Sequence, residues 1–228
     1  FLKSYQNKQY SQKYLKLINK AKQKLKEINI ADDEFLKAVA RYYFKLMAYK
    51  DEYEVARLYT NGEFKKNLYK AFEGDLKLKF HLAPPLFAPR DPNTGKLKKI
   101  TIGAWILPIF KILSKFKFLR GTIFDPFGKT QERRKERLLI NQYLNDINSI
   151  LDKINSNNVT LAIQIASIPE MIRGYGHVKE ENISKASEKR LVSIASVNRI
   201  TSSSLTNEAS ISICVNSGWR SCRRSSSR

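Results

Sequence analysis

The chain contains two histidines, His81 and His177, which are its first candidates for acid–base or nucleophilic catalysis. His81 lies on the lysine-bearing side of an alternating segment, and His177 directly follows a Gly-Tyr-Gly turn. Neither histidine has a second histidine or a cysteine at the spacing that metal ligands require. A structural or hydrogen-bonding role is therefore favoured over catalysis for both, and we predict no metal site.

Two glycine-containing segments have part of the pattern of a phosphate-binding loop. The Gly-Tyr-Gly segment at 174–176 lacks the third glycine of the dinucleotide fingerprint and follows no predicted strand. The Gly-Lys-Thr segment at 128–130 precedes a helix, but the first glycine of a Walker A loop would have to be residue 123, which is isoleucine. Thr130 is better explained as a helix N-cap. We predict no nucleotide loop and no catalytic residue in this chain.

Three arginines lie beside glycine or proline and are candidates for binding an anion: Arg90, Arg120 and Arg173. A guanidinium held on a rigid loop suits bidentate contact with a carboxylate or a phosphate. Together with His81 and His177, these arginines form the predicted set of anion or interdomain contacts. Solvated surface positions are the alternative for all three arginines.

Four basic residues occupy the first turns of the helix predicted after Thr130: Arg133, Arg134, Lys135 and Arg137. Positive charge at a helix N-terminus opposes the macrodipole by roughly a few tenths of a kcal/mol per charge, which indicates an anionic partner. Local ion pairs with the neighbouring glutamates at 132 and 136 are the equally open alternative.

The net charge is +21, from 42 Lys and Arg against 21 Asp and Glu in 228 residues. Residues 1–30 carry eight lysines and a single acid, so this segment is the most concentrated basic region. A positive field attracts nucleic acid, an anionic membrane or an acidic protein. Interleaved lysines and aromatic residues make a basic nucleic-acid-binding module the alternative function. A Lys-, Asn- and Ile-rich composition, as AT-rich genomes produce, would account for the charge without any partner.

The two cysteines exclude a disulfide scaffold and an all-cysteine zinc or iron–sulfur site within this chain. The most apolar stretch, 102–113, is interrupted by a lysine and is far shorter than the ~20 residues of a membrane span. No signal-peptide pattern is visible. We therefore expect a soluble, cytoplasmic protein with no membrane partner.

Apolar residues at steps of three and four predict helices over 3–28, 35–60, 63–72, 105–118, 130–154, 159–167, 170–172 and 179–191. Apolar residues alternate with lysine and histidine over 76–82, which predicts a half-buried strand, and 97–102 is the expected hairpin partner. The predicted fold is α+β and mostly α: a helical accessory domain with a short β-hairpin and two ordered Pro/Gly loops, 83–95 and 120–129.

Composition divides the chain into three predicted parts. Residues 1–30 are a basic helical arm that links to upstream domains, and residues 31–192 are the helical accessory domain. Residues 193–228 contain 12 serines and no lysine, and we interpret them as a disordered Ser/Arg-rich tail of out-of-frame or vector-derived origin. A genuine Arg/Ser nucleic-acid-binding tail is the alternative.

Four long sequence blocks are more specific than any short catalytic motif. They are VARYYFKLMAYKDEYEVARLYT at 39–60, KLKFHLAPPLFAPRDPNTGKLKK at 77–99, KFLRGTIFDPFGKTQERRKER at 117–137 and IRGYGHVKEEN at 172–182. In this order, they resemble the C-terminal module of fused 2-oxoacid:acceptor oxidoreductases of the indolepyruvate ferredoxin oxidoreductase type. The resemblance covers residues 1–190 approximately and stops where the Ser-rich segment begins.

The resemblance implies membership of a larger enzyme. The complete enzymes oxidatively decarboxylate aryl pyruvates to acyl-CoA, use thiamine diphosphate and iron–sulfur clusters, and pass electrons to ferredoxin. None of the motifs for these cofactors falls in this chain, so we expect no cofactor here and no activity from the isolated chain. The implied role is that of an accessory domain that packs against the catalytic domains. Ferredoxin and CoA are then partners of the complete parent enzyme and of this chain only through it. The CoA phosphates, or an acid of a neighbouring domain, are the expected ligands of the three arginines, and nucleic acid is not expected as a partner.

Overall fold

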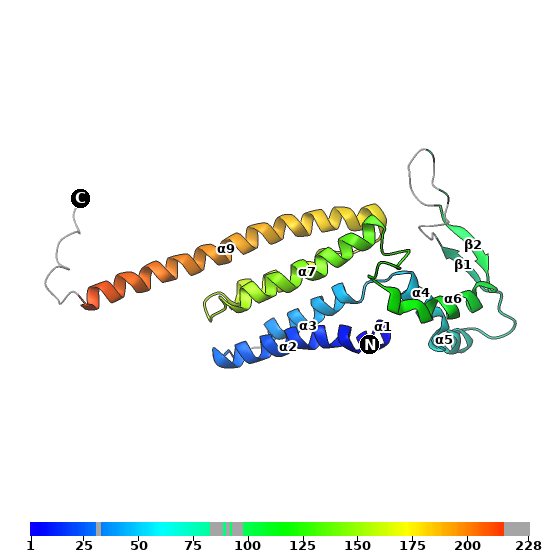
Figure 1. Ribbon diagram of the computed structural model, residues 1–228, viewed down its shortest axis with the longest axis horizontal. Helices are drawn as coiled ribbons and strands as arrows, with labels where there is room; N and C mark the ends of the chain where they lie inside the picture. The colour runs from blue at the N-terminus through cyan, green and yellow to red at the C-terminus, as the bar shows by residue number, and fades with distance from the viewer. Residues whose placement is uncertain (31–32, 83–88, 90–91, 93–97, 217–228) are drawn as a thin grey trace. The chain divides into compact units, whose positions relative to one another are not determined.

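The protein is described here by a computed structural model that covers residues 1–30, 33–82, 89, 92 and 98–216, with the backbone alone at 198 and 200–216. Its helices and strands follow one another as α1 Leu2–Tyr5, α2 Lys8–Glu27, α3 Glu34–Met47, α4 Glu52–Thr60, α5 Glu63–Ala71, β1 Lys79–Leu82, β2 Ile100–Gly103, α6 Ile106–Lys115, η1 Phe116–Leu119, α7 Gln131–Leu151, α8 Val159–Ala166, η2 Ile168–Met171 and α9 Gly176–Asn216 (Figure 1). The predicted α+β, mostly α class is confirmed.

The chain forms two compact units. Unit 1 comprises Phe1–Leu17 and Tyr43–Gln142, and unit 2 comprises Ile18–Tyr42 and Tyr143–Arg228. Each unit therefore combines two separate stretches of chain, whereas the predicted accessory domain is the single stretch 31–192.

The helix predicted over 3–28 is present but is divided into α1 and α2. Asn7 lies at the division, and its side-chain Oδ1 accepts a hydrogen bond from the backbone N–H of Tyr10 at 2.8 Å. This bond satisfies one of the amides that have no partner within the first turn of α2. A polar side chain thus starts a new helix where the apolar spacing predicts a continuous one.

The helix predicted over 35–60 is likewise two helices, α3 and α4. Asp51 has an extended backbone, and its Oδ1 accepts the backbone N–H of Glu54 at 2.9 Å, so it caps α4. Glu52 and Glu54 place negative charge in the first turn, where the helix dipole favours it. The prediction of one helix is wrong. The spacing of apolar residues continues in phase from α3 into α4 and gives no sign of the N-cap at Asp51.

The predicted hairpin is confirmed as an antiparallel pair of β1 and β2, with Phe80 opposite Ile102. Phe80 points into a small core of unit 1 whose buried members are Ala56, Phe80, Ile106 and Phe110. The ring of Tyr59 stands edge-on to the Phe80 ring at 5.0 Å between centroids. This core fastens the hairpin and α6 to α4. The predicted ordered loop at 83–95 lies almost wholly outside the described residues.

Unit 2 is held together by contacts between α7, α8 and α9. The hydroxyl of Tyr143 donates to the carbonyl of Ala166 at 2.9 Å. The guanidinium of Arg190 donates to both carboxylate oxygens of Asp146, at 2.5 Å from Nε and 2.6 Å from Nη2. Ile147 is fully buried beside these groups on α7. A bidentate pair of this kind fixes the direction of α9 on α7 as well as its register.

The last helix differs from the prediction in length. The predicted helix ends at residue 191 and a disordered tail is predicted from residue 193, whereas α9 continues to Asn216 (Figure 1). No glycine or proline occurs from residue 177 to residue 217. Serine, threonine and β-branched residues lower helix propensity by only about 0.7 kcal/mol each at most, so nothing in this stretch forces the helix to end. Residues 217–228 lie outside the described residues.

Within the described parts of the chain, no helix has both the length and the apolar character needed to cross a membrane.

Candidate functional site

The best-defined polar site lies in unit 1 and begins with an ion pair between Asp51 and Arg120. The Arg120 guanidinium donates to the two Asp51 carboxylate oxygens, at 2.5 Å from Nε and 2.8 Å from Nη2. Each side chain is only 3% exposed. The remaining nitrogen, Nη1, donates to the carbonyl of Tyr5 at 2.5 Å. Because all three nitrogens have partners, the buried charge is fully compensated.

The Tyr5 ring closes this site on one side. The guanidinium carbon of Arg120 lies 3.7 Å from the centre of the ring, and the Tyr5 hydroxyl donates to the carbonyl of Tyr49 at 2.8 Å. Burial raises the pKa of Tyr5, so its hydroxyl stays a donor. Burial alone would lower the pKa of Arg120, but the hydrogen bonds and charge of Asp51 outweigh it and raise that pKa. The arginine therefore stays cationic and cannot act as a general acid, although it donates hydrogen bonds.

The second half of the site is the loop at 120–128, which folds around the Asp125 carboxylate. Oδ2 accepts the backbone N–H of Gly121 at 2.8 Å, and Oδ1 accepts the N–H of Gly128 at 2.9 Å. The Tyr53 hydroxyl donates to Oδ1 at 3.1 Å, which ties the loop to α4. We call the five residues Tyr5, Asp51, Tyr53, Arg120 and Asp125 the latch.

Gly128 is required by this loop for steric reasons. A Cβ atom there would lie 2.3 Å from Oδ2 of Asp125, closer than any non-bonded contact allows. The Gly128 carbonyl accepts a hydrogen bond from Nη2 of Arg137 at 2.5 Å. Nη1 of Arg137 is a buried nitrogen with no hydrogen-bond partner among the described residues. The Asp-Pro-Phe-Gly segment is thus closed on itself and carries no exposed catalytic group.

The basic start of α7 is explained in part by pairing inside unit 1. Nη1 of Arg133 donates to Glu136 at 2.6 Å, and Nε donates to Glu52 at 3.4 Å. Burial raises the pKa of Glu52, and the charge of Arg133 opposes that rise. The local-pairing alternative therefore holds for Arg133, which is buried and does not face an external anion.

Four of the five predicted contact residues are described, His81 and Arg120 in unit 1 and Arg173 and His177 in unit 2. Arg120 is buried and makes its bidentate carboxylate contact with Asp51 of its own unit. His81 is exposed on β1, with Nδ1 at 3.0 Å from Oγ1 of Thr101. Arg173 is exposed and pairs with Glu170 three residues earlier. His177 is exposed at the start of α9, and Arg90 lies outside the described residues.

Sequence reasoning missed the two aspartates that organise the site. Asp51 begins an Asp-Glu-Tyr-Glu run, in which an acid three residues after a cap residue is the usual signature of a helix start. Asp125 precedes Pro-Phe-Gly, and an aspartate in such a turn accepts backbone amides two and three residues later. Both local signals are present in the sequence. The pairing of Asp51 with Arg120 has no local signal, since 69 residues separate them.

Among the described residues, no group of three or more His, Cys, Asp or Glu side chains is arranged to hold a metal ion. The model of DUF6537, a family of unknown function, matches residues 1–191. The chain belongs to this family. The match ends where the composition changes to the Ser-rich segment. No curated protein and no solved structure matches the chain.

Proposed function

We propose that this chain is a structural accessory domain of a cytoplasmic 2-oxoacid:ferredoxin oxidoreductase of the indolepyruvate type. In this proposal, the parent enzyme oxidatively decarboxylates aryl pyruvates to acyl-CoA, using thiamine diphosphate and iron–sulfur clusters on its other domains. The chain performs no chemical step. Its role is to pack against the catalytic domains and to stabilise their assembly.

One observation carries the proposal: two of the resembling blocks supply four of the five latch residues. The block at 39–60 supplies Asp51, and the block at 117–137 supplies Arg120 and Asp125. Asp51 and Arg120 compensate each other's charge, and Asp125 accepts backbone amides of its own loop. The Tyr53 hydroxyl fixes that loop to α4. A segment whose distinctive polar residues hold its own backbone in place is typical of a scaffold, because a catalytic site must leave such groups facing a substrate.

Co-purification tests the proposal. The full chain is co-expressed with the thiamine-binding polypeptide of an indolepyruvate-type oxidoreductase, and the two are separated by size exclusion at low salt. We expect a stoichiometric complex and a higher thermal midpoint for the catalytic polypeptide. No association under these conditions contradicts the proposal, and so does turnover of an aryl pyruvate by the isolated chain.

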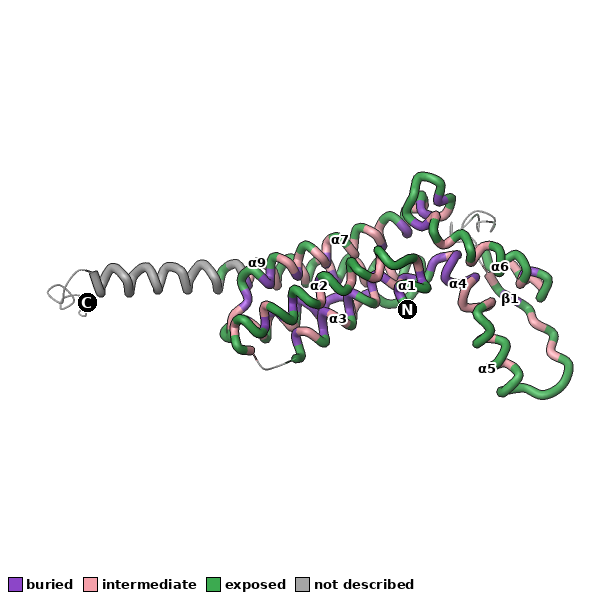
Figure 2. Tube along the Cα trace, turned by 60° about the horizontal axis from the view of Figure 1, so that its bottom comes forward, coloured by how far each residue is buried: buried purple, intermediate pink, exposed green. Residues whose placement is uncertain are grey.

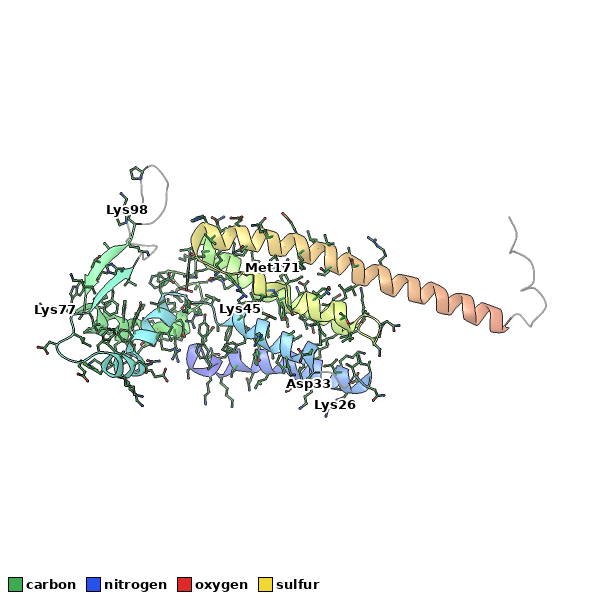
Figure 3. All side chains as sticks on the ribbon, turned by 180° about the vertical axis from the view of Figure 1, so that it is seen from behind. Lys26, Asp33, Lys45, Lys77, Lys98 and Met171 are labelled. Carbon is green, nitrogen blue, oxygen red and sulfur yellow. The ribbon has the colours of Figure 1, made fainter. Side chains whose placement is uncertain are left out.

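A second candidate is a basic nucleic-acid-binding module, and the observation that favours it is the set of exposed lysines along α2. The exposed members are Lys8, Lys13, Lys16, Lys20, Lys22 and Lys26. Figure 3 shows the Lys26 side chain projecting from the end of this helix. Micromolar or tighter oligonucleotide binding at physiological salt, with a steep salt dependence, would favour this candidate. Weak binding that disappears at physiological salt leaves the accessory-domain proposal in place.

A further inference from the structure

Helix α6 carries large apolar side chains on a face that nothing in the described structure covers. Trp105 is 66% exposed, Ile109 48%, Ile112 59% and Phe116 41%. These residues recur at steps of four, three and four, so they form a single line along the helix. The line is about 16 Å long, or three turns. We call these four residues the α6 stripe.

The stripe is separate from the face by which α6 joins its own core. Ile106 and Phe110 point into the core of unit 1, where the Phe110 ring lies 5.9 Å from that of Tyr59. Figure 2 shows α6 largely exposed, next to the more buried α4. A helix that is apolar on most of its circumference is normally buried on more than one side. The second apolar face of α6 is therefore suited to being covered by a further structural element.

Each end of the stripe contacts a neighbouring part of unit 1. At the first end, a Cβ atom on Gly103 would lie 3.2 Å from Cδ1 of Trp105, so the indole rests closely against the end of β2. At the other end, the Phe116 ring lies 6.0 Å from the ring of Phe118, which is itself exposed. Exposed tryptophan and phenylalanine side chains are among the residues that commonly anchor protein interfaces.

The charges beside the stripe indicate the kind of partner. Lys111 and Lys115 are exposed and lie one helical turn apart on the same helix. Residues 98–124 contain no aspartate or glutamate. A surface that covers the stripe would therefore place its border against positive charge and would gain from acidic residues there. A second copy of this chain is disfavoured, because a symmetric contact would bring the same lysines together.

We propose that the α6 stripe docks an amphipathic helix of a partner polypeptide, with an apolar seam bordered by Asp and Glu. The three-and-four spacing matches the ridges by which two helices pack. A lipid surface fits less well, because lysines border only one edge of the stripe and the other edge continues into the core. The inference rests on the proposed function only for which polypeptide supplies the helix.

Trp105 provides the measurement. The chain has two tryptophans, so Trp219→Phe in the full chain leaves Trp105 as the only indole. This protein is titrated with a synthetic helical peptide of about 18 residues, or five turns, with leucine along one face and glutamate beside it. A second peptide has lysine at every glutamate position. Mixed phosphatidylcholine–phosphatidylserine vesicles form the third arm.

We expect a blue shift of the Trp105 emission and a micromolar dissociation constant for the glutamate peptide. The lysine peptide should bind about tenfold more weakly, or more weakly still. Ile109→Ser with Ile112→Ser should weaken binding about tenfold or more. Leu138→Ser, at a residue that is 65% exposed on α7, is the matched control and should change nothing. Lys111→Glu with Lys115→Glu should reverse the preference between the two peptides, and it keeps the apolar residues intact if the serine variant fails to fold.

The proposal is overturned if neither peptide binds, if both bind equally, or if binding is unaffected by the stripe variants. Binding to the vesicles without binding to the glutamate peptide assigns the stripe to a membrane and also overturns it. None of these measurements uses the parent enzyme. A failure here therefore leaves the co-purification result standing, and a failed co-purification leaves the peptide result standing.

Discussion

The latch and the α6 stripe belong to the same compact unit but differ in solvent exposure: the charged groups are buried and the apolar groups are exposed. The latch removes three full charges from solvent, those of Asp51, Arg120 and Asp125, and gives each of them hydrogen-bond partners inside the unit. The stripe leaves its apolar groups in water although the opposite face of α6 is packed into a core. Burying a charge is costly unless every partner is present, whereas exposing an apolar side chain forgoes a gain of about 1.5–3 kcal/mol. The comparison separates a region that is complete within the chain from a region that is not.

The contrast between the latch and the α6 stripe also shows that distinctive polar residues need not mark a functional site. Polar residues with distinctive spacing attract a functional reading, and here Arg120 and Asp125 turn out to hold the fold. The apolar residues of α6 look like ordinary core residues in the sequence, yet they remain exposed. In this unit the distinctive polar residues are buried, whereas the α6 stripe leaves apolar side chains exposed.

The strongest test of the latch removes its cation. Arg120→Met leaves the Asp51 carboxylate buried without its partner, and we expect a loss of about 3–5 kcal/mol in the free energy of unfolding. Chemical denaturation followed by circular dichroism measures it. The control is Arg173→Met, which breaks an exposed pair with Glu170 and should cost about 0–1 kcal/mol. Equal losses in the two variants would show that the latch contributes no more than a surface pair.

Alkaline pH tests the burial of Tyr49, whose carbonyl accepts the Tyr5 hydroxyl of the latch. Burial, with the negative charge of Asp51 adding to it, raises the pKa of Tyr49 from 10.0 to about 12. Below pH 10 the protonated tyrosine contributes its full stability. Between the two pKa values the unfolded chain loses a proton that the folded chain keeps, so stability falls by about 1.4 kcal/mol per pH unit for this residue. Denaturation curves from about pH 8 to about pH 11 should show the fall. In Tyr49→Phe the slope should be smaller by that amount, and an unchanged slope contradicts the assignment.

The loop half of the latch is tested by sterics. Gly128→Ala would bring a methyl group to 2.3 Å from the Asp125 carboxylate, and we expect a loss of about 1–3 kcal/mol. A double-mutant cycle identifies the cause. With Asp125→Ala already present, the same glycine substitution should cost much less, because the clashing oxygen is gone. Additive losses would mean that the glycine is required for another reason.

The sequence predicted the elements better than their ends or their partners. The hairpin was predictable because alternation over 76–82 is a local pattern, and so was the Thr130 cap before α7. The breaks before α2 and α4 were missed because a capping side chain outweighs the apolar period there. The contact of Arg120 with Asp51 needs the tertiary fold, since no local pattern links residues so far apart.

The smallest expected effect decides whether the α6 stripe is free surface in the isolated chain. Ile112→Ser should change the free energy of unfolding by no more than about 0.5 kcal/mol, because the side chain is 59% exposed. Phe110→Ala on the opposite face of the same helix should cost about 3–5 kcal/mol, because its ring packs against Tyr59 and Phe80. Thermal and chemical denaturation of both variants measure the contrast within one helix. A loss above about 1 kcal/mol for Ile112→Ser would show that the folded chain already covers this residue, since that is the range of core substitutions. The stripe would then have no surface left to offer a partner helix.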